Sequence, residues 1–191
     1  ANLAISLNPD FKYSAVKANG ETLIIATDLV SNAMEASGIS DYTTIKEFTG
    51  SELEGLTYQH VQFEDRVCPI ILGNHVTLEA GTGCVHTAPG HGQDDYVVGA
   101  RYGIEPLSPV DGRGCYTGKA GKYEGTHVFK ANEVVIEDLK ASGALLHNEA
   151  INHSYPHCWR CSTPVIYRAT PQWFVSMDAN DLRDKACAAV D

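Results

Sequence analysis

The stretch from Gly81 to Tyr96 constrains the fold more than any other part of this 191-residue chain. Its sixteen residues, GTGCVHTAPGHGQDDY, include four Gly, one Pro, two His, two Asp and two Thr. Gly and Pro set the shape of the backbone, so this run is too broken for a helix and too polar for a core strand. We therefore expect a shaped loop that holds polar side chains at a functional site, with the rest of the chain as scaffold.

Around this loop the sequence predicts many short strands and a few helices. Asn19-Gly20 between two alternating segments is a hairpin-turn signal, and Gly38 and Gly143 follow apolar residues at helical spacing. The expected strands are 13–19, 21–27, 42–49, 56–63, 68–72, 75–79, 83–87, 145–147 and 172–177, and the expected helices are 29–37, 94–102, 130–143 and 178–189. This pattern predicts a mainly β, α+β fold, a β-barrel with peripheral helices.

The charge balance argues against a domain that grips nucleic acid by itself. Lys and Arg number 14 against 24 Asp and Glu, a formal charge of −10, and the basic residues are scattered rather than gathered in a stripe. No apolar run approaches the roughly 18 residues that span a bilayer, and no basic-then-apolar leader is present. We expect a cytoplasmic protein without a membrane partner. Because the first residue is Ala, we also expect a fragment or a processed chain.

The six cysteines have one informative pair. Cys158 and Cys161 have the Cys-x2-Cys spacing of half a zinc ribbon, whereas the other four lack any framework spacing, so reduced thiols are expected. A closed structural zinc site needs four ligands. His153 and His157 are candidates for the other two, but one short segment rarely wraps a metal, so we expect no complete metal site. Cys84 is expected to be a buried strand residue rather than a nucleophile.

Three interpretations of the Gly-His-Asp loop stay open on composition alone. His86, His91 and Asp95 supply three metal ligands, although the helical spacing and the general-base Glu of a zinc hydrolase are missing. Alternatively, the polar groups make local hydrogen bonds and cap a helix. In the third interpretation the loop forms a substrate pocket, where a carboxylate at a helix start holds an ammonium group and an imidazole shapes the cavity.

The loop string GTGCVHTAPGHGQDDY resembles the connective-peptide editing domain of the isoleucyl-, valyl- and leucyl-tRNA synthetases. The resemblance extends over essentially the whole chain, from ANLAIS at the start to HSYPHCWRCSTPVIYRATPQWF near the end, and the HCWRC…TPQWF tail favours the isoleucyl branch. It implies an editing domain of the barrel type over residues 1–152. It also implies that residues 153–191 return toward the synthetic domain and carry the Cys-x2-Cys knuckle.

The resemblance implies a hydrolase that removes valine from tRNA(Ile) by water attack on the ester and excludes isoleucine. A hydrophobic pocket discriminates weakly against a side chain one methylene smaller, and isoleucyl-tRNA synthetases are a standard example of a second site that corrects this. The implied partners are the 3′ end of valine-charged tRNA(Ile) and the other synthetase domains. No cofactor is expected in this fragment. The parent enzyme would ligate isoleucine to tRNA with ATP and Mg, and zinc is a further candidate.

Matched position by position, the family pattern makes Asp95 the partner of the α-ammonium group and His86 the wall that sets the size limit. These two are the predicted catalytic residues. Asn2 borders the pocket, and the predicted substrate-binding set is Asn2, Gly83, His86, Thr87, His91 and Asp95. The family's Thr-rich strand, which precedes the position of Ala1, is absent, so we expect impaired activity. Two alternatives remain, a non-catalytic barrel that binds the tRNA 3′ end and a metallohydrolase that uses His86, His91 and Asp95.

Overall fold

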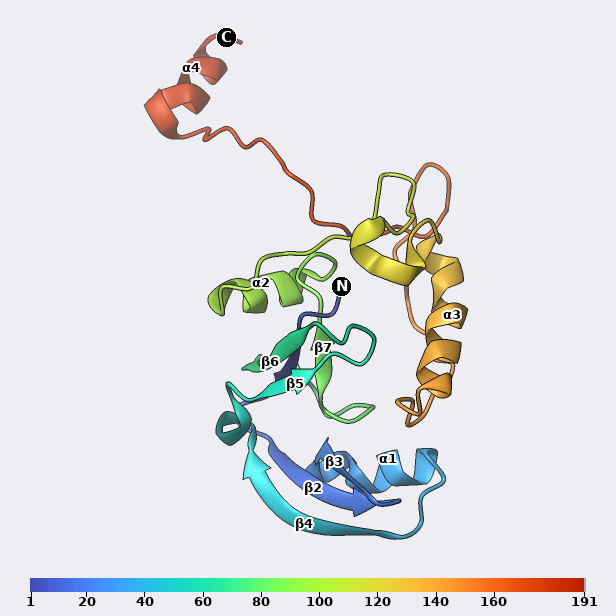
Figure 1. Cartoon of the computed structure of the whole chain (residues 1–191). Helices are drawn as coiled ribbons and strands as arrows, with labels where there is room; N and C mark the ends of the chain where they lie inside the picture. The colour runs from blue at the N-terminus through green and yellow to red at the C-terminus, as the bar shows by residue number, and fades with distance from the viewer. Residues whose placement is uncertain (191) are drawn as a thin grey trace.

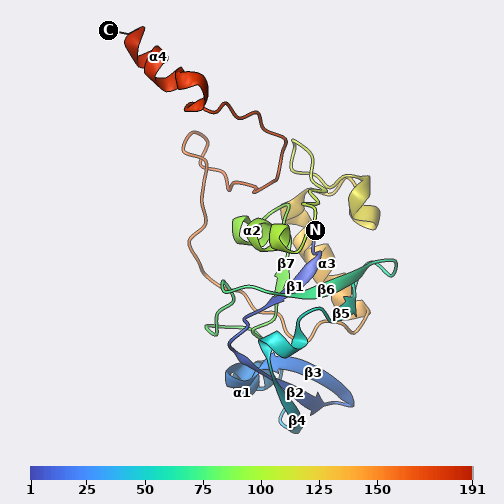
Figure 2. The ribbon, with the colours of Figure 1, turned by 90° about the vertical axis from the view of Figure 1, so that its left-hand side faces the viewer.

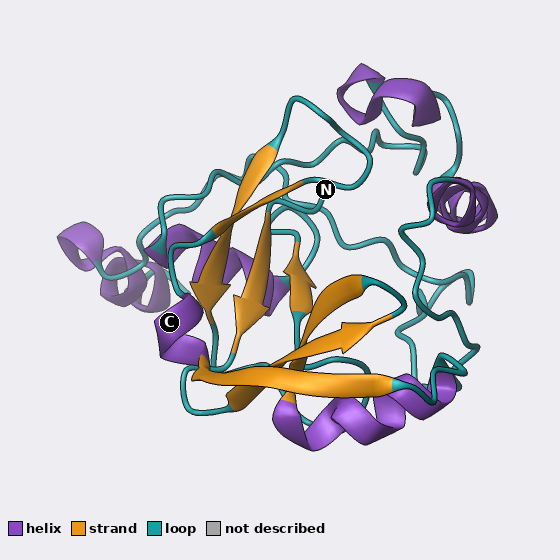
Figure 3. Ribbon diagram, turned by 60° about the horizontal axis from the view of Figure 1, so that its bottom comes forward, coloured by secondary structure: helices purple, strands orange, loops and turns teal. Residues whose placement is uncertain are grey.

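Two separate β-sheets form the body of the molecule in the computed structural model, which describes residues 1–190 (Figure 1). The four-stranded sheet has the order β5-β6-β1-β7, and the three-stranded sheet has the order β3-β2-β4. The strands are β1 (Ala4–Leu7), β2 (Lys12–Ala18), β3 (Glu21–Ala26), β4 (Tyr42–Thr49), β5 (Thr57–Gln59), β6 (Val67–Leu72) and β7 (Val85–Thr87). Figure 3 shows the two sheets at an angle to one another.

Four α-helices and four short 3₁₀ helices surround the sheets within residues 1–190. The α-helices are α1 (Val30–Ala36), α2 (Gln93–Arg101), α3 (Val128–Ala141) and α4 (Leu182–Ala188). The 3₁₀ helices are η1 (Thr27–Leu29), η2 (Gly50–Leu53), η3 (Gly118–Tyr123) and η4 (Ala179–Asp181). None of the helices in this described part is long and apolar enough to cross a membrane.

The predicted fold class is confirmed, and the arrangement of its strands is corrected. Seven strands and peripheral helices are present, but they form two sheets, and no closed barrel is found among the described residues. β1 lies between β6, to which it is parallel, and β7, to which it is antiparallel. β1 is not among the predicted strands, because a segment of four residues is too short to show a clear alternation of apolar and polar residues.

Several predicted elements match and three do not. The β2–β3 hairpin turns at Asn19 and Gly20, both with positive φ as expected. Residues 75–79, 145–147 and 172–177 were expected to be strands but have no strand structure, and 56–63 shortens to β5. An extended segment becomes a strand only when a neighbouring strand pairs with its backbone, and these segments have no such neighbour within residues 1–190.

A helix packs on each sheet, and the larger of the two buried clusters is shared between the sheets. Val30 and Met34 of α1 lie in this cluster with Val16 and Ile25 of the three-stranded sheet, and Leu7 of β1 joins them from the four-stranded sheet. On the four-stranded sheet, Val98 of α2 packs with Ala4 and Ile71, and Ile104 lies against them. The Tyr13 hydroxyl joins the two parts, because it donates a hydrogen bond to the Gly83 carbonyl at 2.9 Å. The loop that leads into β7 is thereby tied to β2.

The chain after α3 lies largely outside these cores. No described residue beyond Ala131 is buried, and α4 stands apart from the body in both Figure 1 and Figure 2. Three hydrogen bonds bring residues 167–169 back to the body, and they join Tyr167 to His91, Arg168 to Val110 and Ala169 to Gly90. The domain boundary near residue 152 remains a prediction.

Candidate functional site

Asp95 lies in the first turn of α2, where the Gly-His-Asp loop ends. Gly92 is the N-cap residue, with extended backbone, so Asp95 is the third residue of the helix. The backbone N–H of Ala88 donates to Asp95 Oδ2 at 2.9 Å, which fixes one carboxylate oxygen against the loop. A carboxylate in this position is also stabilised by the helix dipole. The prediction that the helix begins at these acidic residues is confirmed.

His75 faces the other oxygen of the same carboxylate. Its Nε2 atom is 4.0 Å from Asp95 Oδ1, and the two side chains are only 18% and 19% exposed. His75 is not among the predicted site residues, because residues 75–79 are predicted to be a strand. The available signal was the Gly73-Asn74 turn immediately before it, which places the imidazole on a loop.

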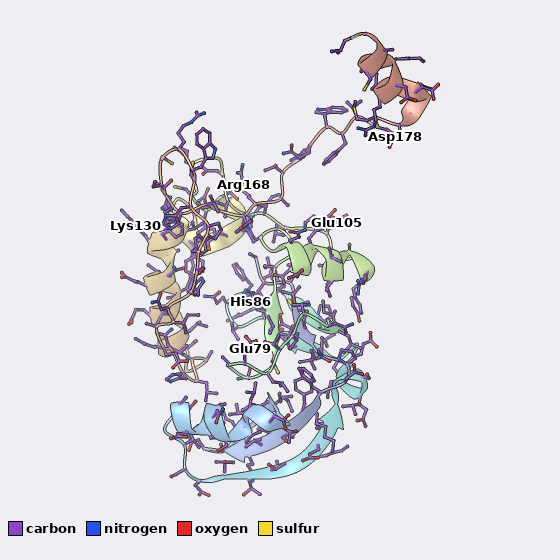
Figure 4. All side chains as sticks on the ribbon, turned by 180° about the vertical axis from the view of Figure 1, so that it is seen from behind. Glu79, His86, Glu105, Lys130, Arg168 and Asp178 are labelled. Atoms are coloured by element: carbon purple, nitrogen blue, oxygen red, sulfur yellow. The ribbon has the colours of Figure 1, made fainter. Side chains whose placement is uncertain are left out.

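The two site residues of β7 have very different surroundings. Successive residues of a strand point to opposite faces. Accordingly, Thr87 is fully buried with its Oγ1 2.6 Å from Ser6 Oγ, whereas His86 is exposed. In Figure 4, His86 lies on the side of β7 that faces α3. His86 is therefore free to meet a ligand, while the Thr87 hydroxyl is engaged in holding β7 to β1.

Gly83 and Asn2 occupy structural positions beside β7. Gly83 has φ +70°, and a Cβ there would lie 2.5 Å from Ala26 Cβ, so this position requires glycine. Asn2 is half-buried just before β1, and its Oδ1 accepts a hydrogen bond from the Tyr58 hydroxyl at 3.2 Å. The backbone of the next residue, Leu3, donates to the Thr87 carbonyl. The start of the chain thus borders β7, and the pocket-lining role of Asn2 stays a prediction.

His91 belongs to a neighbouring groove rather than to the Asp95 carboxylate. Its Nδ1 is 2.9 Å from the Tyr167 carbonyl oxygen, and burial lowers the pKa of its imidazole. It borders a cavity of about 520 Å³ between the loop, α2 and residues 167–174. The lining residues, all from the described chain, are Pro89, Gly90, His91, Gly92, Gln93, Tyr96, Tyr167, Arg168, Ala169, Thr170, Gln172 and Phe174.

The structure does not assemble the metal site that one interpretation required. Within residues 1–190 no group of three or more His, Cys, Asp or Glu side chains is placed to hold a metal ion. His91 is turned to the Tyr167 carbonyl and Asp95 to the Ala88 amide. The metallohydrolase with His86, His91 and Asp95 as ligands therefore has no support in the geometry.

The Cys-x2-Cys segment forms a short turn. The Cys158 N–H donates to the Thr163 carbonyl, and Cys161 Sγ lies 2.9 Å from Thr163 Oγ1. His157 Nδ1 is 2.9 Å from the Ser162 carbonyl oxygen, so this nitrogen is turned to the backbone. A turn with two thiols supplies two of the four ligands of a structural zinc site. The described residues of this segment thus do not complete such a site.

Comparison with known proteins identifies what the whole chain resembles. No protein-family model matches it. It is 52% identical over all 191 residues to the isoleucine-tRNA ligase of Desulfotalea psychrophila and 50% identical over 192 aligned residues to that of Thermotoga maritima. These matches cover 100% of this chain but only 20% and 21% of the relatives, so the chain spans about a fifth of their length.

A solved structure shows the same fold. The crystal structure of GlLeuRS-CP1 superposes with a TM-score of 0.63, at 17% identity, over 78% of this chain and 79% of that one. The predicted resemblance to the isoleucyl enzymes is confirmed by these relatives, and the solved CP1 structure confirms the fold.

Proposed function

Since the chain matches isoleucine-tRNA ligases along its whole length, we propose that it is their editing domain and hydrolyses valine from mischarged tRNA(Ile). The observation that carries this proposal is the Asp95 carboxylate, whose Oδ2 the Ala88 amide holds at the start of α2. A binding module without catalysis would need the same carboxylate, so only a measurement of hydrolysis separates the two possibilities.

Asp95 recognises the part of the substrate that every aminoacyl ester shares. The α-amino group of the esterified amino acid is charged near neutral pH, and a charge-assisted hydrogen bond to a carboxylate orients it. Ala88 occupies one acceptor position on Oδ2. A carboxylate has about four such positions, so Asp95 can accept from the ammonium group while the loop continues to hold it.

His86 supplies the discrimination between valine and isoleucine. It is exposed on β7, one residue before the anchored Thr87, so its backbone position is set by the sheet. An imidazole whose backbone is held in this way admits a side chain up to a given size and collides with one that is a methylene longer. An editing site that excludes the correct amino acid in this way compensates for a synthetic pocket that discriminates weakly between isoleucine and valine.

The proposed reaction is direct hydrolysis. A water oxygen attacks the ester carbonyl carbon, and the bond from that carbon to the ribose oxygen then breaks. One proton of the water goes to the ribose oxygen, which leaves tRNA with a free hydroxyl. The carboxylic acid of the released valine then loses the other proton to solvent and becomes a carboxylate. Burial raises the pKa of the Cys84 thiol to about 11, which makes this nearby cysteine a poor nucleophile.

The acidic character of the chain fits a module that receives only the end of the tRNA. With a formal charge of −10, it lacks the basic surface needed to neutralise many phosphates. In this proposal the other domains of the ligase hold the tRNA body and charge it with isoleucine, using ATP and Mg. The site of action would be the cytoplasm.

The decisive experiment compares Asp95→Ala with Asp94→Ala in the full-length ligase. Asp94 is the adjacent acid on α2 and is exposed, which makes it a matched control. We expect Asp95→Ala to slow release of valine from tRNA(Ile) by about 100-fold, because a hydrogen bond to a charged group contributes ~1.5–3 kcal/mol, while charging with isoleucine is unchanged. Asp94→Ala should deacylate normally.

Two results would refute the proposal. If Asp95→Ala released valine at the normal rate, Asp95 would not hold the substrate. If the variant lost affinity for valine-charged tRNA while the unaltered enzyme showed no hydrolysis, the chain would be a binding module.

A further inference from the structure

At two glycines near the site, the backbone conformation does not require glycine. Gly92 has φ −119°, and Gly73 is not among the residues with positive φ. Both are instead crowded by one side chain each. A Cβ on Gly73 would lie 2.4 Å from His75 Cε1 and 2.6 Å from its Nδ1, and a Cβ on Gly92 would lie 2.7 Å from Asp95 Oδ2. Side chains at positions 73 and 92 would thus displace the His75 imidazole and the Asp95 carboxylate, which face each other.

Both ring nitrogens of His75 are buried, and their hydrogen-bonding capacity is unused. Neither is accessible to solvent, and neither has a hydrogen-bond partner among the described residues. An imidazole always carries at least one N–H donor, and leaving a buried donor unpaired is unfavourable. The acceptor that its Nε2 faces is Asp95 Oδ1, 4.0 Å away.

We propose that His75 is a positioning residue for Asp95, donating Nε2–H to Oδ1 while the Ala88 amide holds Oδ2. This inference rests on the proposed function, and it names a second determinant of the same site. Closing the pair by about 1 Å brings the two atoms to hydrogen-bond distance, and such contacts commonly tighten when a substrate is bound. Held from both sides, the carboxylate keeps a single orientation toward the ammonium group.

An imidazole suits this position better than a permanently charged side chain. Lys or Arg beside Asp95 would form an ion pair and compete with the substrate ammonium for the carboxylate. An imidazole has an N–H donor even without a charge, so it can orient the carboxylate and leave its negative charge available. His75 thus acts on substrate binding through Asp95, without touching the reacting ester.

The test uses His75→Gln and His75→Leu in the full-length ligase, with His60→Leu as the control. Gln places an N–H donor near the position of Nε2, whereas Leu fills the space without a donor. His60 is another buried imidazole, 5% exposed, whose Nδ1 accepts from the Gln62 amide rather than facing Asp95. We expect His75→Leu to raise KM for valine-charged tRNA(Ile) about tenfold with little change in kcat, the loss expected for one hydrogen bond. His75→Gln should stay within about threefold of the unaltered enzyme because its donor restores the bond.

The kinetic results separate this inference from the proposed function. If Asp95→Ala is impaired but His75→Leu is normal, the positioning role is refuted and the editing function stands. If Gln and Leu at position 75 are equally impaired and both variants remain folded, His75 only fills space. A tenfold rise in KM for His60→Leu would likewise mean that loss of any buried imidazole has this effect.

A spectroscopic readout applies even if no valine is released. In the 191-residue chain, ¹H–¹⁵N correlation spectra of the imidazole should show His75 protonated at Nε2, with a shift that changes in Asp95→Asn. An unprotonated Nε2, or a signal insensitive to Asp95→Asn, would refute the pairing independently of hydrolysis.

Discussion

The Gly-His-Asp loop (residues 81–96) and the knuckle segment (residues 153–177) are both rich in residues that can do chemistry, yet the fold treats them differently. In the loop, polar groups bond to partners far along the chain, such as Thr87 to Ser6 and the Gly83 carbonyl to Tyr13. In the knuckle the bonds are mostly local, such as His157 to Ser162 and Cys161 to Thr163. The comparison indicates that polar and reactive side chains form a rigid site only where contacts with distant parts of the chain hold them in place.

The largest expected difference between the two regions is in the reactivity of their thiols. Burial raises the pKa of Cys84 in the loop to about 11, whereas the hydrogen bond from Thr163 lowers the pKa of the exposed Cys161 in the knuckle. Two pKa units above the ordinary value of 9.0 leave Cys84 with about 100-fold less thiolate than an ordinary thiol. Alkylation with iodoacetamide at pH 8, followed by peptide mass spectrometry, should therefore label Cys161 at least about 100-fold faster than Cys84.

Cys161→Ser is the control that identifies the fast site. Unfolding in urea should bring the Cys84 rate up to that of an ordinary thiol. Equal labelling of Cys84 and Cys161 in the folded chain would show that the loop is no better packed than the knuckle.

A smaller effect is expected from side chains added at two glycines of the loop. Both have positive φ, but a Cβ at Gly83 would meet Ala26 Cβ at 2.5 Å, whereas one at Gly81 has nothing within 4 Å. Gly83→Ala should lower the free energy of unfolding by about 3 kcal/mol through strain and overpacking, against about 1 kcal/mol for Gly81→Ala through strain alone. Urea denaturation of the 191-residue chain measures both. Equal losses would mean that the contact between Gly83 and β3 carries no stability.

The smallest effect is expected in the knuckle segment, where large apolar side chains are exposed to solvent. Trp173 is 101% exposed and Met34 in the core of the three-stranded sheet is 0% exposed. Trp173→Ser should change the free energy of unfolding by less than about 0.5 kcal/mol, whereas Met34→Ala should lower it by about 3 kcal/mol. A loss of 1 kcal/mol or more for Trp173→Ser would contradict the exposed position of this segment.

The parts of the fold that were predicted well depend on neighbours in sequence. The Asn19-Gly20 hairpin, the stop of α1 before Gly38 and the start of α2 at its acidic residues were all confirmed. Turn chemistry and helix termini are set by a few adjacent residues. The strands β2, β3, β4 and β6 were also placed closely, because each has a readable apolar pattern.

The errors lie where the outcome depends on a partner elsewhere in the chain. Residues 172–177 have the composition of a strand, but no described strand pairs with them. The reverse applies to β1, whose four residues are unremarkable until β6 and β7 pair with it on both sides. Sheet closure is likewise a property of pairing, so short strands predicted a barrel and the chain forms two sheets.

By itself the sequence determined the Gly-His-Asp loop, the helix that follows it and the family resemblance that gave roles to Asp95 and His86. It could not show that Thr87 is bonded to Ser6, that His91 is turned to Tyr167, or that His75 faces Asp95. These pairings join residues separated by 81, 76 and 20 positions. They arise only when the sheets and α2 pack together, because a hydrogen bond or a shared cavity depends on distance in space and not on order in the chain.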